Sequence, residues 1–161
     1  MGKYKQVKEK FTVDDGLDTS EIESLRGEMQ EWVDNMGGTA LENTSRYQTA
    51  EEAVNTLEGV DNIRFDNIWD AVGNTKSLTV DGLKALEYEV IIFKVKGQRQ
   101  HPSRAYRLSN AISAINGALE CLREFLERWS DDEVGEIRAA IDEVESIVDE
   151  LDGVEFPGMY G

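Results

Sequence analysis

The chain is poor in cysteine and histidine, with one of each among its 161 residues. The single cysteine, Cys121, excludes an intramolecular disulfide, and we expect it to be a small buried hydrophobic residue beside an apolar helix face. The single histidine, His101, excludes a histidine-rich metal site. His101 also lies about five helical turns before Cys121, which argues against a cysteine–histidine nucleophile pair.

Long apolar runs are also missing from the chain. No stretch approaches the roughly 20 consecutive apolar residues of a membrane-spanning helix. The lysine-rich residues 1–10 are not followed by an apolar run, so they do not resemble a secretory signal. We therefore expect a soluble intracellular protein that has no membrane partner.

Basic residues are few beside the acidic ones, 17 against 33, which gives a formal net charge of -16. This charge argues against direct binding to nucleic acid or to an anionic membrane, because both need a cationic surface. It is compatible with a basic protein partner or with imitation of a polyanion. The hydrophobic share of 40% is enough for one domain with a sizeable core.

The most informative pattern is a pair of heptad seams in the last third of the chain. Apolar residues recur at spacings of three and four on both sides of a polar break at residues 130–132. They are Leu108, Ile112, Ile115, Leu119, Leu122, Leu126 and Trp129 before the break, and Val134, Ile137, Ile141, Val144, Val148 and Leu151 after it. This period places the residues on one stripe of each helix. The short break between the seams predicts an antiparallel helical hairpin.

Similar spacing in the first third predicts another helical hairpin. The middle of the chain contains a β-branched and aromatic segment, residues 87–96, which favours a strand; a helical continuation is the alternative. The centre of this segment, Val90–Phe93, is apolar on both faces, so we expect it to be buried on both sides. A lone strand is not stable, so it needs residues 4–13 or a second copy of the chain as its partner.

The predicted fold is mainly α, with two antiparallel helical hairpins in a bundle-like body and a small two-stranded β element. No low-complexity linker divides the chain, so we expect a single domain over residues 1–161. Its predicted parts are an N-terminal arm or strand (1–18), a helical hairpin (19–60), a mixed region (61–100), a second hairpin (101–153) and a tail (154–161). The tail either docks on the body or reaches a partner.

Acidic residues concentrate in the last predicted helix, where residues 131–152 hold ten acids and one base. The candidate binding residues form two stripes. The outward stripe is Asp132, Glu136, Glu143 and Glu150, and the stripe closer to the seam is Asp142, Glu145, Asp149 and Asp152. A helix of roughly 33 Å then carries one net charge per about 3.7 Å, less than half the density of B-DNA at about one per 1.7 Å. DNA mimicry would need further acids from elsewhere, and the alternative is a solvated helix face.

A basic segment joins the predicted strand 87–96 to the first helix of the C-terminal hairpin. It has five bases and no acid, namely Lys94, Lys96, Arg99, Arg104 and Arg107. Arg104 and Arg107 lie one turn apart at the predicted start of a helix, where free amide groups and the helix dipole favour anions. One interpretation is therefore an anion-binding site. The alternative is intramolecular compensation of acidic neighbours, or pairing with another subunit.

No motif in the chain indicates a catalytic site or a cofactor, and no residue is assigned to a metal. Some acid pairs have the spacing of the magnesium motif in all-α nucleotide pyrophosphohydrolases. These pairs are Glu28 with Glu31, Glu124 with Glu127, and Glu58 with Asp61. We expect Glu28 and Glu31 to face outward, and Gly59 interrupts the last pair. The sequence therefore predicts a protein that is not an enzyme, with a magnesium-dependent nucleotide hydrolase as the enzymatic alternative.

Two parts of the chain resemble segments of small uncharacterised acidic helical proteins of tailed bacteriophages and prophages. The first part is LRGEMQEWVDNM (25–36) with LENTSRY (41–47) and AVNTLE (53–58), and the second is SRAYRLSNA (103–111). The motifs cover a minor part of the chain and carry no known chemistry, so no functional residue is transferred. The resemblance implies a viral accessory or virion-associated protein that acts in a bacterial cell.

These observations predict a phage-type accessory protein that binds a host or viral protein through its acidic helices. In its most specific form it is a DNA-mimic-like inhibitor of a nucleic-acid-processing or host-defence enzyme, so that its partner is a DNA-binding enzyme. The alternative is a self-assembling structural or virion-associated protein, a homo-oligomer held by strand 87–96, the basic segment and the tail. The expected location is the cytoplasm of a bacterial host cell, or a virion in the alternative.

Overall fold

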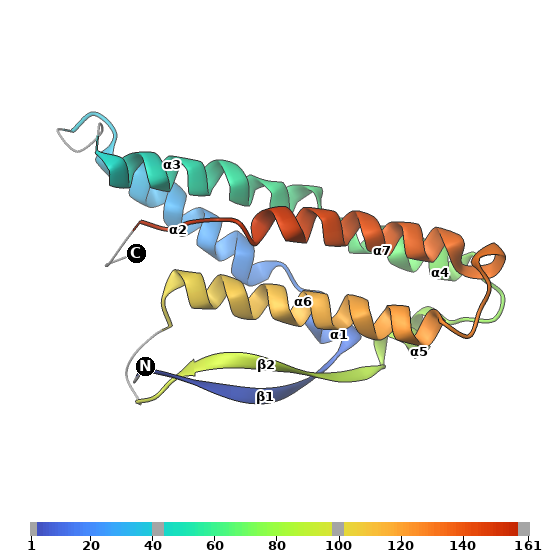
Figure 1. The fold of residues 1–161 in the computed structure, drawn as a ribbon. Coiled ribbons are helices and arrows are strands. Elements are labelled where there is room, and N and C mark those ends of the chain that lie inside the picture. Colours follow the sequence, from blue (N-terminus) through green and yellow to red (C-terminus); the bar gives the residue numbers. More distant parts are fainter. Residues whose placement is uncertain (1–2, 40–43, 98–101, 158–161) are drawn as a thin grey trace.

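A computed structural model describes residues 3–39, 44–97 and 102–157 of the chain. The fold is mainly helical with one small antiparallel sheet of two strands, as the sequence predicts (Figure 1). None of the helices in these three segments is both long and apolar enough to cross a membrane.

The described residues form two strands and helices of very different length. In chain order they are β1 (Tyr4–Thr12), α1 (Val13–Gly16), α2 (Ser20–Met36), α3 (Ser45–Leu57), the 3-10 helix η1 (Glu58–Asn62), α4 (Phe65–Gly73), α5 (Val80–Lys84), β2 (Glu87–Val95), α6 (Arg104–Leu126) and α7 (Asp131–Leu151).

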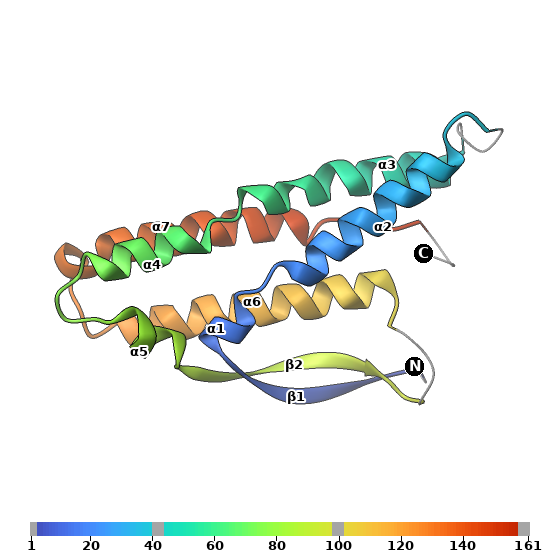
Figure 2. The same cartoon turned by 180° about the vertical axis from the view of Figure 1, so that it is seen from behind.

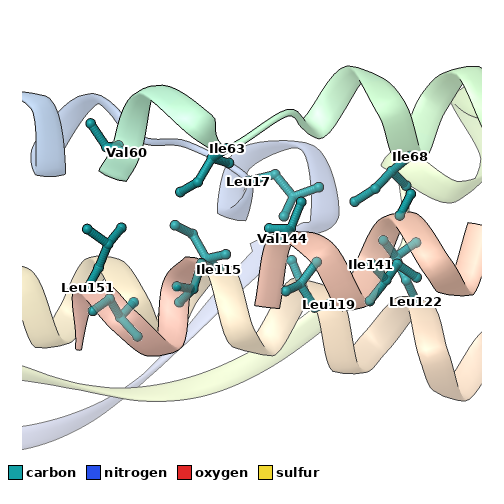
Figure 3. Packing of buried hydrophobic residues seen from close by; sticks show 14 of the residues in the cluster. Leu17, Val60, Ile63, Ile68, Ile115, Leu119, Leu122, Ile141, Val144 and Leu151 are labelled. Atoms are coloured by element: carbon teal, nitrogen blue, oxygen red, sulfur yellow. The ribbon is translucent and has the colours of Figure 1, made fainter. Parts of the chain in front are cut away.

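The helices enclose one hydrophobic core. Helix α2 packs against α3 and α6, whereas α7 contacts α4, η1 and α6 (Figures 1 and 2). The residues of both heptad seams within α6 and α7 are buried, as predicted, and Trp129 beyond the end of α6 is partly buried. Figure 3 shows Leu119 of α6 and Val144 of α7 in the same cluster as Ile63, which follows η1.

The two strands form an antiparallel ribbon, in which residues 4–12 pair with residues 87–95. The strand predicted over residues 87–96 and its pairing with residues 4–13 are therefore confirmed. Helix α6 supports the ribbon, because the hydroxyl of Tyr88 donates a hydrogen bond of 2.5 Å to the carbonyl oxygen of Ala114. Gly117 allows this close approach, since a Cβ atom there would lie 2.5 Å from the side chains of both Tyr88 and Val90.

The expectation that Val90–Phe93 is buried on both faces is wrong. Ile92 is only 8% exposed, whereas the neighbouring Ile91 is 50% exposed. Successive side chains of a strand point to opposite faces, and a ribbon of two strands on α6 has one covered face. The β-branched character of the segment thus reflects its strand conformation and not a double-sided environment.

The described part of the tail docks on the body. Val154 and Phe156 pack against the hydrophobic core, and Pro157 is buried. Residues 158–161 of the predicted tail lie outside the described residues.

Candidate acidic interaction surface

Helix α7 carries two groups of acids that differ in their surroundings. The stripe closer to the seam is partly neutralised by Arg123 of α6. The Arg123 guanidinium lies 2.7 Å from a carboxylate oxygen of Asp142 and 2.7 Å from one of Glu145. The hydrogen bond to Glu145 is the main cause that raises the pKa of Arg123. Asp149 and Asp152 of the same stripe are exposed.

A second base, Arg138 of α7, serves the connection between α6 and α7. Its guanidinium forms an ion pair with Asp131 and donates a hydrogen bond of 3.0 Å to the carbonyl oxygen of Leu126. Ser130 and Glu133 form a capping box at the first turn of α7. The base and two of the acids in this part of α7 therefore stabilise the junction of the two helices.

The outward stripe has no such partners. Its four carboxylates are exposed, and none of them takes part in an ion pair or hydrogen bond within residues 3–39, 44–97 and 102–157. They are Asp132, Glu136, Glu143 and Glu150. Because α7 is continuous from Asp131 to Leu151, these side chains extend along one face of a single rigid element.

Helix α4 contributes a further acid to this face. A shallow groove of about 420 Å³ runs between α4 and α7, and its lining includes Asp70, Glu136 and Glu143. The amide side chains of Asn67 and Asn74 lie beside these acids, and none of the residues that line the groove is basic. We call Asp70, Asp132, Glu136, Glu143 and Glu150 the acidic face.

Sequence reasoning missed Asp70, because its place depends on the packing of α4 against α7, which are about 60 residues apart in the chain. No local pattern indicated it, because Ile68, Ala71 and Val72 form the buried side of α4 and Asp70 lies on the other side of this helix.

The basic segment is occupied by intramolecular contacts at its helical end. The Arg107 guanidinium donates hydrogen bonds of 2.9 and 2.7 Å to the two carboxylate oxygens of Glu28, and one of 2.7 Å to Glu21. Nε of Arg104 donates a further bond of 3.0 Å to Glu28. Ser103 caps the helix by accepting a hydrogen bond from the amide of Tyr106.

These contacts have an electrostatic effect on both partners. The hydrogen bond from Arg107 lowers the pKa of Glu28, burial opposes this shift, and Arg104 adds to it. The same bond with Glu28 raises the pKa of Arg107. The expectation that Glu28 faces outward is wrong, because α2 crosses α6 at this point and turns Glu28 toward the two arginines. The intramolecular alternative accounts for the contacts of Arg104 and Arg107.

The remaining bases of the segment lie near the end of the ribbon. Nζ of Lys94 is 3.9 Å from a carboxylate oxygen of Glu9, and the side chain of Lys96 is exposed. Arg99 and His101 lie outside the described residues.

Two of the acids with magnesium-motif spacing are bound by arginines. Glu28 binds Arg104 and Arg107, and Asp61 forms an ion pair of 2.7 Å with Arg26. In the part of the chain that the structure describes, no three histidine, cysteine, aspartate or glutamate side chains are grouped so that they could hold a metal ion.

Cys121 is half-buried rather than fully buried, with its Sγ 3.8 Å from the carbonyl oxygen of Glu87. Burial raises the pKa of this thiol and so favours its protonated form. The environment is that of a packing residue at the contact between α6 and β2.

A larger hollow of about 690 Å³ lies between the ribbon, α1 and α6. Its lining includes Phe11 and Ile92. Of its polar side chains, Arg107 binds Glu21 and Glu28, and Asn110 binds the backbone of β2. The acids Glu9, Asp15 and Asp18 also line the hollow.

Comparisons with known proteins provide no family for this chain. No protein-family model matches it, and searches of curated proteins and of solved structures give no match. Function is therefore inferred from the surface geometry and from the chemistry of the residues on it.

Proposed function

We propose that the protein is not an enzyme and that its acidic face binds a basic surface of a partner protein. The observation that carries the proposal is the contrast within α7. Asp131, Asp142 and Glu145 are paired with arginines, whereas the outward carboxylates form no ion pair in the described segments, although Arg64 lines a hollow together with Glu143.

Five carboxylates on α4 and α7 create a negative potential on one side of the molecule. Lysine and arginine side chains of a partner would form charge-assisted hydrogen bonds with them. The groove between α4 and α7 offers Asp70 and Glu143 together with the amide of Asn67, which suits a guanidinium or ammonium group inserted between the helices. Such charge complementarity also accelerates association and selects the partner.

The resemblance to phage proteins supports a partner in a bacterial cell, either a host protein or a viral one, with the cytoplasm or a virion as the location. A DNA-binding enzyme is the most specific form of this proposal, because such enzymes present basic surfaces to DNA. The pairing of Arg123 with Asp142 and Glu145 lowers the free charge of α7 below the value that the sequence implies. We therefore base the proposal on a basic protein surface and treat DNA mimicry as its special case.

The same proposal includes an architecture of two helical hairpins in a bundle-like body. The contacts of α2 with α3 and of α6 with α7 support these pairs. In this arrangement one face of α7 packs against α6, and the outward stripe of α7 remains available for a partner.

The experiment compares capture of proteins from a bacterial lysate by three forms of the chain, followed by mass spectrometry. The first form is the unchanged protein. The acidic-face variant reverses the four outward carboxylates by Asp132→Lys, Glu136→Lys, Glu143→Lys and Glu150→Lys. The control variant makes the same change in net charge at exposed acids elsewhere, by Glu31→Lys, Glu51→Lys, Glu52→Lys and Glu127→Lys.

We expect a partner that the unchanged protein and the control variant capture and that the acidic-face variant loses. Release of this partner by competing DNA would identify it as a DNA-binding protein. Equal capture by all three forms would contradict the proposal, and so would equal loss by both variants, because net charge alone would then explain the binding. Circular dichroism confirms that each variant is folded.

A further inference from the structure

The two edges of the β ribbon are treated differently by the fold. The outer edge of β2 faces α6, and the side chain of Asn110 bonds to it in the manner of a neighbouring strand. The amide of Phe93 donates a hydrogen bond of 2.8 Å to Oδ1 of Asn110, and Nδ2 of Asn110 donates one of 2.8 Å to the carbonyl oxygen of Phe93. This edge is therefore closed.

The outer edge of β1 is open. Because the backbone groups of Phe93 point away from β1, Phe93 and its partner Gln6 form a non-hydrogen-bonded pair of the ladder. Hydrogen-bonded and non-hydrogen-bonded pairs alternate along an antiparallel ladder. The backbone N–H and C=O groups of Gln6, Lys8 and Lys10 therefore point away from β2. No backbone group within the three described segments bonds to them. Figures 1 and 2 show β2 between β1 and α6 along the middle of the ribbon, with the strands crossing near its ends.

We propose that β1 pairs with β1 of a second copy of this chain, antiparallel and about a two-fold axis, to give a four-stranded sheet. The axis passes between Val7 and Val7 of the second copy, which form a non-hydrogen-bonded pair. Gln6 then faces Lys8 of the second copy, and Lys8 faces Gln6, so that both copies use the backbone groups that are free at the edge. This geometry is an isologous interface that closes after two subunits.

The charges along β1 favour a second copy of this chain as the strand that pairs with its open edge. Within the ribbon Lys5 lies directly opposite Lys94, and like charges at such positions are destabilising. Lys94 lies near Glu9, whereas no acid of the described segments pairs with Lys5. The proposed register places Lys5 opposite Glu9 of the second copy, and the two-fold axis repeats this pair.

Lysines on an edge strand commonly prevent uncontrolled strand pairing, and here they disfavour two of the alternative registers. A shift of two residues toward the C-terminus of β1 would place Lys8 opposite Lys8 of the second copy. A larger shift would place Glu9 opposite Glu9. The proposed register avoids both like-charge pairs, and it leaves Lys8 beside an uncharged glutamine.

This interface goes beyond the proposed binding function and is independent of it. The ribbon and the pair of α4 and α7 lie on opposite sides of α6 in both views (Figures 1 and 2). A dimer formed through β1 would therefore carry two acidic faces that remain exposed. The acidic-face variant should dimerise like the unchanged protein even if its partner binding is lost.

Sedimentation measurements test the dimer. They should cover protein concentrations up to about 1 mM, because a weak specific dimer can have a dissociation constant of that order. Lys8→Pro is the first variant. Its proline lacks an amide hydrogen at a position where the amide points outward, so the ribbon keeps its own ladder while the dimer loses two hydrogen bonds. We expect dimerisation to weaken at least about tenfold.

Lys5→Glu is the second variant and tests the register. It places a glutamate opposite Lys94 within the ribbon, which favours the folded monomer, and opposite Glu9 of the second copy, which opposes the dimer. The double variant Lys5→Glu, Glu9→Lys restores opposite charges across the axis. We expect the single variant to be monomeric and the double variant to dimerise again.

Val7→Cys, made together with Cys121→Ser, is the third variant. The two new cysteines would sit in a non-hydrogen-bonded pair with Cα atoms about 4.5 Å apart, within the roughly 4.4–6.8 Å that a disulfide spans. We expect a disulfide-linked dimer under mild oxidation, and much less of it for Lys10→Cys in the same background.

A protein that stays monomeric over the whole concentration range would overturn the proposal and leave the edge to a foreign strand. A dimer that Lys8→Pro and Lys5→Glu do not weaken would also overturn it, because the contact would then lie on another surface. If Lys8→Pro fails to fold, the charge exchange and the Val7→Cys cross-link decide the question.

Discussion

Helices α6 and α7 are neighbours of similar length, yet several of their polar residues have different uses. On α6 three partly buried side chains hold the molecule together: Arg107 binds α2, Asn110 binds β2, and Arg123 binds α7. On α7 the outward carboxylates have no partner in the described segments. A helix with many charges is therefore not by itself a binding surface; what matters is which charges the fold leaves unpaired.

The largest effect on stability is expected from a comparison of one substitution on α6 with one on α7. Arg107→Ala leaves Glu28 and Glu21 without their main donor, and we expect the free energy of unfolding to fall by about 2 kcal/mol. Glu143→Ala on α7 should change it by less than about 0.5 kcal/mol. Urea unfolding measures both, and similar values for the two variants would contradict the difference between the helices.

The two mid-helix glycines Gly117 and Gly135 give the next test. Alanine favours a helix over glycine by about 1 kcal/mol, and at Gly135 a Cβ atom meets nothing within 4 Å. Gly135→Ala should therefore stabilise the protein by about 0.5–1 kcal/mol. Gly117→Ala should destabilise it by about 1–2 kcal/mol, because the new methyl group collides with Tyr88 and Val90. Thermal unfolding checks the two signs, and stabilisation by both would show that the ribbon does not pack closely on α6.

The pH dependence of stability sharpens the comparison further. The pKa of Glu28 is lowered in the folded state, so its contribution is present above the ordinary carboxyl pKa and is lost as the pH falls through the folded value. Glu28→Gln should be less stable than the unchanged protein at about pH 7, and the gap should narrow toward about pH 3. Glu31→Gln is the control on the same helix. A gap that stays constant with pH would show that the carboxylate charge is not what Arg107 recognises.

The smallest expected effect concerns the acidic face itself. Glu136→Gln with Glu143→Gln removes two like charges beside Asp70, and it should raise the free energy of unfolding by roughly a few tenths of a kcal/mol at low salt. The gain should vanish at high salt, where exposed charges are screened. Asp142→Asn with Glu145→Gln should instead lower stability, because these carboxylates bind Arg123. Equal effects of the two double variants would contradict the distinction between the stripes.

The local elements were predictable from the sequence, because their signals are periodic. The heptad seams correctly identified the large buried residues of α6 and α7, and the β-branched run identified β2. What could not be predicted is how charges meet across the fold. Glu21 and Glu28 are seven residues apart beside the buried face of α2, but only the crossing of α2 and α6 brings them to Arg107.

The same limit applies to the surfaces. The exposure of Ile91 depends on the number of strands in the sheet, which the sequence of one strand does not state. The acidic stripes were correctly placed on one helix, yet only the position of Arg123 separates the paired stripe from the unpaired one. Asp70 joins the acidic face through a tertiary contact that no local pattern encodes.

The central claim is that the outward carboxylates of α7 serve a partner, whereas Arg107 and Arg123 of α6 serve the fold. The most direct measurement is partner capture, made side by side with Arg107→Ala and with the acidic-face variant at a temperature where both are folded. We expect Arg107→Ala to keep the partner despite its lower stability, and the acidic-face variant to lose the partner at nearly unchanged stability. Loss of the partner by Arg107→Ala together with full capture by the acidic-face variant would contradict the claim.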